Sequence, residues 1–283
     1  MNSLSKRIEA IRNDRSHGAS ELTRQALKIM QDAARASTAD NPLEFLDDMR
    51  RIAGNLIITR TTMVSIRNSI SRFMFKLIAE CAKSDNNLES LQTWSVQTTV
   101  DLINIVAEAR DKAIINATEF IPDGARLLTC SYSSTVIDTL KHTVTSGKSF
   151  NIMVLESQFG RFKYGEMAAA RLAEKGIACT VIPDKQIKAI LPQSDMILIG
   201  ADAVLTDGSI INGCPSLVLA RVAAENMPPV PVYSICESIK FYPGKTLSLE
   251  EEGFDLIPAQ LIKGIITEDA ILNPANGASH TLL

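Results

Sequence analysis

The order of predicted elements between residues 126 and 235 constrains the fold more than any other feature of this sequence. Short apolar segments alternate there with helical segments, and each apolar segment has the length and composition of a buried strand. Strands are expected at 126–130, 151–155, 179–182, 196–199 and 230–235. Because parallel neighbours need a crossover between them, this alternation predicts a parallel sheet with helices on both faces.

The connections between these strands are predicted to be helical, at 133–146, 164–175, 185–190 and 215–225. Gly147 and Gly176 follow two of the helices, and glycine often ends a helix in this way. Two more short strands are expected at 254–257 and 264–267. Residues 121–283 are therefore interpreted as an α/β domain.

Residues 1–120 have the pattern of an all-helical domain that ends in a long linking helix. Apolar residues recur at helical spacing over 4–37, 43–58, 66–82 and 89–119, with a polar break at 12–20. Ser20 is expected to cap the helix that follows Gly18. With Phe45 on its flank, the buried stripe of the second helix is expected to consist of Leu43, Leu46, Met49, Ile52 and Leu56.

Charge and hydropathy exclude several classes of protein. The 283-residue chain has a net charge of −3 with its basic residues dispersed, so no direct nucleic-acid site is expected. No run of about 18 apolar residues could span a membrane. Residues 1–20 lack the apolar core of a signal peptide. We therefore expect a soluble, cytoplasmic protein.

Cofactor and metal motifs are missing from the sequence. The five cysteines are widely spaced without a C-x-x-C pair, and only three histidines are present, which argues against a zinc site and a disulfide framework. No G-x-G-x-x-G follows the first strand, and no G-x-x-x-x-G-K-[ST] occurs. Reduced thiols, no metal and no organic cofactor are expected.

Polar side chains follow the predicted parallel strands where each strand ends. Because these carboxyl ends meet at one edge of the sheet, the side chains are expected to lie together. They come from Cys130–Ser133, Glu156–Gln158, Asp184, Asp202 and Glu237–Lys240. Carboxylates and hydroxyls suit the hydroxyl groups of a sugar. The alternative is that the acids only cap helices.

Phosphate would need other partners, because carboxylates repel it. Arg12 and Arg15 precede the helix start at Gly18 and Ala19, and Arg60 precedes another helix. Arginines and helix N-termini are favourable phosphate sites. The alternatives are a solvated charged turn around Arg12 and Arg15 and a capped loop with surface arginines around Arg60. A sugar phosphate held between the two domains is the expected ligand.

Residues 200–212, GADAVLTDGSIIN, resemble the signature GAD-x-(I/V)-x-x-(N/D)-G-x-(I/V)-x-N. This signature belongs to the family that unites the regulatory subunits of eukaryotic initiation factor 2B with isomerases of ribose-1,5-bisphosphate and 5-methylthioribose-1-phosphate. Further resembling segments are 128–134, Glu156-Ser157, 236–241, 258–262 and 266–268, with weaker ones at 12–19 and 60–68. The resemblance implies a Rossmann-like C-terminal domain that forms the dimer.

The resemblance also implies that Asp202 is one of two catalytic residues, the other being a cysteine after the first strand. This chain has Ser131 at the cysteine position, with Cys130 one residue earlier. A serine has no thiol, so it cannot supply the thiolate base that a cysteine can supply near neutral pH. Gly213 replaces the family's lysine, and Gln158 replaces an arginine, a lost charge that Arg161 or Lys163 would restore.

Two functions are consistent with these residues. The departures favour an initiation-factor-2B-like regulatory protein that binds a sugar phosphate or nucleotide and contacts a partner such as an initiation factor 2 subunit. The alternative is an aldose–ketose isomerase of a phosphorylated pentose, with Asp202 opposite Cys130 or Ser131. A homodimer or a higher even oligomer is expected. The predicted ligand-binding residues are Arg12, Arg15, Gly18, Ala19, Arg60, Glu156, Ser157, Asn212, Glu237 and Lys240.

Overall fold

The computed structural model describes residues 3–83, 87–244, 247–249 and 251–276. The chain forms two compact units, residues 1–108 and 109–283, and the last turns of the long fifth helix belong to the second. Within the described ranges, no helix is both long enough and apolar enough to cross a membrane.

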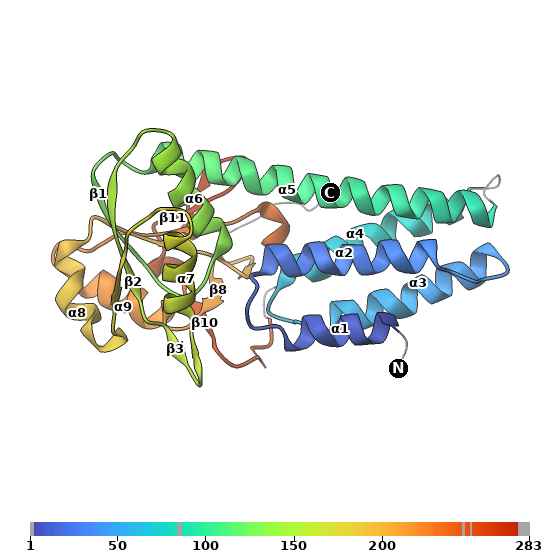
Figure 1. Cartoon of the computed structure of the whole chain (residues 1–283), viewed down its shortest axis with the longest axis horizontal. Helices are drawn as coiled ribbons and strands as arrows, with labels where there is room; N and C mark the ends of the chain where they lie inside the picture. Colours follow the sequence, from blue (N-terminus) through green and yellow to red (C-terminus); the bar gives the residue numbers. More distant parts are fainter. Residues whose placement is uncertain (1–2, 84–86, 245–246, 250, 277–283) are drawn as a thin grey trace. The chain divides into compact units, whose positions relative to one another are not determined.

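The first unit is helical, as predicted. It contains α1 (Ser3–Asn13), α2 (Ala19–Arg35), α3 (Pro42–Ile57), α4 (Val64–Cys81) and most of α5 (Leu88–Phe120) (Figure 1). Helix α4 packs against both α2 and α3. Phe45, Phe73 and Leu77 are among the fully buried side chains of this core.

Two details of these helices differ from the prediction. Helix α2 is capped by Gly18 and begins at Ala19, so Ser20 lies inside the helix. Leu43 is 75% exposed, whereas Phe45 is fully buried. The buried stripe of α3 runs from Phe45 through Met49 in steps of three and four residues, and Leu43 lies on the other side of the helix.

The second unit is built on a seven-stranded sheet with the strand order β12-β11-β9-β6-β1-β2-β5. All neighbouring strands are parallel except β11 and β12, so the predicted parallel sheet is confirmed. The strands are β1 (Ala125–Thr129), β2 (Phe150–Leu155), β5 (Thr180–Ile182), β6 (Met196–Ile199), β9 (Val232–Ile235), β11 (Gly264–Ile266) and β12 (Ile271–Leu272).

Helices cover both faces of this sheet, and alternate strand residues pack against opposite helices (Figure 1). Leu127 lies in a cluster with Leu140 and Leu172, whereas its neighbour Leu128 lies in a cluster with Leu219. The helices are α6 (Ser134–Thr145), α7 (Tyr164–Ala173), α8 (Ile187–Ile190) and α9 (Ser216–Glu225). The 3-10 turns are Asp184–Gln186, Leu191–Gln193, Ser238–Lys240, Ala259–Leu261 and Pro274–Asn276.

Two small antiparallel sheets were not predicted. Strand β8 (Ile210–Gly213) lies between β7 (Ala203–Val204) and β10 (Phe254–Ile257). Strands β3 (Gln158–Phe159) and β4 (Phe162–Lys163) form a hairpin. Segments this short contain too few residues for an alternating pattern, so only the more apolar β10 was expected to be a strand.

Candidate functional site

The carboxyl ends of the parallel strands bring several predicted site residues to one edge of the sheet. Strand β1 leads to Ser131, β2 to Glu156 and Ser157, β6 to Asp202, and β9 to Glu237 and Lys240. Asn212 lies on β8, the strand to which Asp202 is tied by a hydrogen bond from its backbone N–H to the carbonyl of Ile211 (2.8 Å). We call Ser131, Ser157, Asp202, Asn212, Glu237 and Lys240 the strand-end cluster.

Two serines of this cluster have left-handed backbone conformations. Ser131 has φ 61° and Ser157 has φ 51°. Residues other than glycine adopt this region at a cost of about 1–2 kcal/mol each. Surrounding hydrogen bonds hold them: the N–H of Ser131 donates to Oγ of Ser157 (2.7 Å), and the N–H of Ser157 donates to Asp184 (2.9 Å). Strained residues concentrate at functional sites.

Lys240 and Glu237 form a buried ion pair with Nζ and Oε2 2.9 Å apart. Burial alone would lower the pKa of Lys240 and raise that of Glu237. Burial is the largest single cause for each group, but the opposite charge of the partner, the hydrogen bond between the two groups and smaller contributions from neighbouring groups together outweigh it, so the pKa of Lys240 is raised and that of Glu237 is lowered. The nearby carboxylate of Asp202 also raises the pKa of Lys240. The pair therefore places a stable cation beside Asp202.

Ser131 and Cys130, the two candidates for the second catalytic residue after β1, differ in their surroundings. Ser131 is half-buried at the strand end, whereas Cys130 is 1% exposed and lies in the core under α9. Burial raises the pKa of Cys130 to about 12. Its Sγ lies 3.3 Å from Oγ of Ser216, which accepts a hydrogen bond from Asn212 (2.8 Å). A thiol in this position is a poor base near neutral pH.

Gly213 and Ser131 are in close contact. A Cβ atom added to Gly213 would lie 2.1 Å from Oγ of Ser131. The serine hydroxyl therefore occupies the space where the side chain of the family's lysine would begin. A lysine at this position requires Ser131 to move.

Glu156, a predicted ligand-binding residue, is already in an ion pair. Lys163 binds Glu156 (2.9 Å) and Glu166 (2.9 Å) at the same time. Hydrogen bonds to Glu166 and Glu156 raise the pKa of Lys163. The guanidinium of Arg161 lies over the ring of Phe162 at 5.1 Å from its centroid.

The predicted phosphate residues of the first unit gather around the loop between α1 and α2. Arg15 and Arg60 both donate to the backbone carbonyl of Asp14 (2.9 and 2.7 Å). Gly18 and Ala19 form the start of α2, as described above, and Arg12 is paired with Glu9 (2.6 Å). Arg60 is only 4% exposed and stabilises this loop. Phosphate binding by these residues stays a prediction.

Three polar residues of the second unit were missed by sequence reasoning. Arg110, in the interior of α5, pairs with Asp138 and lowers the pKa of Glu237 as a minor contribution. Asp255 accepts hydrogen bonds from the Cys214 thiol and the Leu217 N–H (both 3.0 Å). Ser216 links Cys130 to Asn212. Except for Asn212, which is four residues from Ser216, their partners are 28 or more positions away, so no local pattern indicates these contacts.

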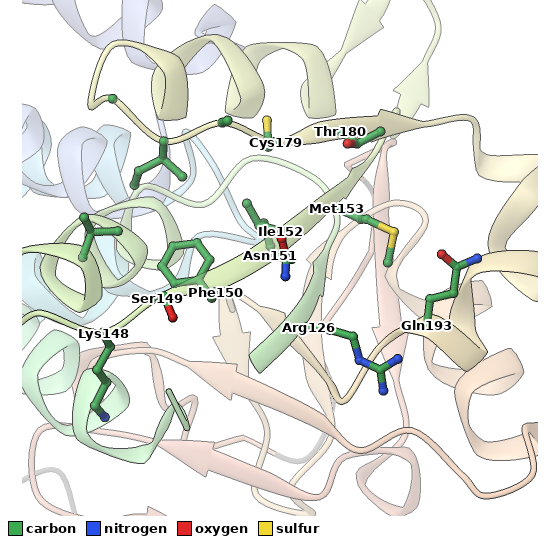
Figure 2. Close-up of a pocket in the computed structure, with 14 residues that line it drawn as sticks. Arg126, Lys148, Ser149, Phe150, Asn151, Ile152, Met153, Cys179, Thr180 and Gln193 are labelled. Atoms are coloured by element: carbon green, nitrogen blue, oxygen red, sulfur yellow. The ribbon is translucent and has the colours of Figure 1, made fainter. Parts of the chain in front are cut away.

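A hollow of about 770 Å³ lies at the opposite edge of the sheet, around the amino ends of β1, β2 and β5 (Figure 2). Its lining includes Arg126, Lys148, Asn151, Thr180 and Gln193. No residue of the strand-end cluster lines it. This hollow is therefore separate from the candidate site.

Comparison with known proteins establishes the family. Residues 15–252 match the model of the initiation factor 2 subunit family. The chain belongs to this family. The expectation drawn from the GADAVLTDGSIIN segment is thereby confirmed.

Relatives of the initiation factor 2 subunit family match nearly the whole chain. Ribose 1,5-bisphosphate isomerase from Methanocaldococcus jannaschii is 26% identical over 302 residues, covering 97% of this chain and 92% of that protein. The crystal structure of the Pyrococcus horikoshii OT3 translation initiation factor eIF-2B covers 98% of both chains, with a TM-score of 0.82 and 22% identity.

The tetrameric eIF2B-beta2-delta2 complex from C. thermophilum has the same fold. It covers 97% of this chain and 91% of the compared chain, with a TM-score of 0.79 and 18% identity. These likenesses confirm the predicted helical N-terminal region followed by a Rossmann-like α/β sheet.

Proposed function

We propose that this family member binds a phosphorylated pentose at the strand-end cluster and interconverts its aldose and ketose forms. The observation that carries the proposal is the half-buried Asp202 beside the cation of Lys240. Several relatives that match at least 94% of the chain are named ribose 1,5-bisphosphate isomerase. Because of these relatives, we now prefer the isomerase to the regulatory role that the departures at Ser131 and Gly213 had favoured.

The chemistry requires a base, an acid and stabilisation of developing charge. In a sugar 1-phosphate, the base removes the proton from C2, the bond from C1 to the ring oxygen breaks, and that oxygen takes up a proton. C1 is then protonated while the C2 hydroxyl loses its proton and becomes the ketone. We assign the C2 proton to the Asp202 carboxylate. Ser131 and Lys240 donate hydrogen bonds to the ring oxygen, which develops negative charge as its bond to C1 breaks.

A regulatory role is the second candidate. The buried Cys130 thiol and the missing lysine at Gly213 favour it, because both weaken the isomerase machinery. In this role the chain would bind a sugar phosphate or nucleotide without converting it and would contact a partner such as an initiation factor 2 subunit. A homodimer or higher even oligomer and a cytoplasmic location stay predictions for both functions.

Turnover separates the two candidates. The purified protein is incubated with ribose-1,5-bisphosphate or 5-methylthioribose-1-phosphate, and formation of the ketose is followed. We expect Asp202→Asn to lower kcat by about 100-fold or more, because loss of a positioned base costs that much. Asp195→Asn is the matched control, since Asp195 is exposed and pairs with Arg126 at the opposite edge of the sheet.

Two results would contradict the isomerase proposal. One is the absence of ketose with both substrates, and co-purification of a translation GTPase subunit would then support the regulatory role. The other is equal turnover by the Asp202→Asn variant and the Asp195→Asn control.

A further inference from the structure

The base of the β3–β4 hairpin, Gln158–Lys163, lies beside Ser131. The residue before it, Ser157, accepts the hydrogen bond from the Ser131 N–H (2.7 Å). The two carboxylate oxygens of Asp184 accept from the N–H groups of Ser157 (2.9 Å) and Gln158 (3.2 Å). The base of the hairpin is therefore held by the same contacts that hold the strand-end cluster.

The hairpin also lies against the segment where the family's lysine is missing. The ring of Phe159 is 3.1 Å from the position that a Cβ atom of Gly253 would take. The carbonyl of Gly253 accepts a hydrogen bond from the N–H of Cys214 (2.9 Å). Cys214 directly follows Gly213, so the hairpin borders the position that lacks a cationic side chain.

The two cations of the hairpin differ in their partners. Lys163 is held by Glu156 and Glu166. Arg161 is exposed, and among the described residues it has no carboxylate within ion-pair distance. Its guanidinium lies over the Phe162 ring, which itself stacks on Tyr164 with the ring centroids 5.9 Å apart. Stacking engages the face of the guanidinium and leaves its N–H edge available.

We propose that Arg161 binds a phosphomonoester group of the substrate and supplies the charge that Gly213 does not. This inference rests on the proposed function of the strand-end cluster as a phosphopentose site. A guanidinium can donate two parallel hydrogen bonds to phosphate oxygens, which a lysine cannot. The stacked aromatic rings hold the guanidinium in place before the ligand binds.

Titration calorimetry with ribose-1,5-bisphosphate tests this role. The dissociation constant is measured for Asp202→Asn and for Asp202→Asn with Arg161→Ala, so that turnover does not disturb the binding signal. We expect Arg161→Ala to raise the dissociation constant about tenfold or more, as loss of a charge-assisted hydrogen bond does. Arg161→Lys is expected to restore part of the affinity.

Arg171→Ala is the control, because it removes the same charge from an exposed α7 residue that pairs with Glu174. Unchanged binding in this variant beside weak binding in Arg161→Ala supports the inference, whether or not the wild-type protein shows turnover. Equal binding by the Arg161→Ala and Arg171→Ala variants overturns it, even where turnover supports the isomerase proposal. Absence of ribose-1,5-bisphosphate binding to the wild-type protein also overturns it.

Discussion

The two edges of the parallel sheet differ in what their polar groups do. At the amino edge, Arg126 is paired with the exposed Asp195, and Lys148 donates to three carbonyls at the end of α5. At the carboxyl edge, Ser131 has a left-handed backbone, and a buried ion pair lies beside Asp202. The amino edge has the large hollow, but its charges stabilise the fold. The arrangement of the side chains, rather than the presence of a hollow, therefore identifies the candidate site at the carboxyl edge.

The largest expected difference between the edges concerns their ion pairs. Glu237→Gln leaves Lys240 buried without its carboxylate, and we expect a loss of about 3–5 kcal/mol in the free energy of unfolding. Asp195→Asn breaks a pair whose side chains are 49% and 43% exposed, so the loss should be below about 1 kcal/mol. Urea unfolding of both variants measures this difference. Equal losses would show that the two edges are energetically alike.

A second prediction concerns the contact between Gly213 and Ser131. Gly213→Lys forces the Ser131 side chain to move, and we expect a loss of about 1–3 kcal/mol in the free energy of unfolding, as overpacking does. Adding Ser131→Ala should recover part of this loss, because it removes the hydroxyl that blocks the new side chain. A double-mutant cycle by urea unfolding measures the coupling. Additive losses would contradict the contact.

A third prediction concerns the pH dependence of stability contributed by the buried thiols. Burial raises the pKa of Cys130 and Cys236 from 9.0 to about 12. Their contribution to stability is therefore complete below about pH 9 and is lost as pH rises from 9 towards 12, by at most about 1.4 kcal/mol per pH unit for each thiol. Urea unfolding at several pH values measures this loss.

Cys130→Ala should reduce the loss of stability above pH 9. The half-exposed Cys179, which lines the hollow at the amino edge, should react with a thiol reagent at pH 8 much faster than Cys130. Rapid labelling of Cys130 in the folded protein would contradict its burial.

Much of the fold could be predicted because its signals are local. The run Met196–Ile199 is apolar throughout, and all of it is buried as the strand β6. The two-residue strands β3 and β7 could not be predicted, because their pairing depends on partners and turns rather than on a repeating pattern. Leu43 shows a related limit, since helical spacing alone does not define which side of a helix meets the core.

For the candidate site, the sequence predicted which side chains would lie at the same edge of the sheet, but not the hydrogen bonds between them. Asp202 and Lys240 each follow a parallel strand, so the order of elements was enough to predict that they lie near each other at one edge of the sheet. The hydrogen bond between Ser131 and Ser157 joins residues 26 positions apart, and no pattern in the sequence indicates it.

By itself, the sequence determined the alternation of strands and helices, the residues that follow each strand and the segment that identifies the family. These are properties of neighbouring residues, which the order of the chain specifies directly. Only the tertiary structure decided that Ser131 rather than Cys130 lies at the site's edge. It also decided that Lys163 has carboxylate partners, whereas Arg161 has none within the part of the chain that the structure describes. Burial and pairing depend on which distant segments meet, and that is settled only when the chain has folded.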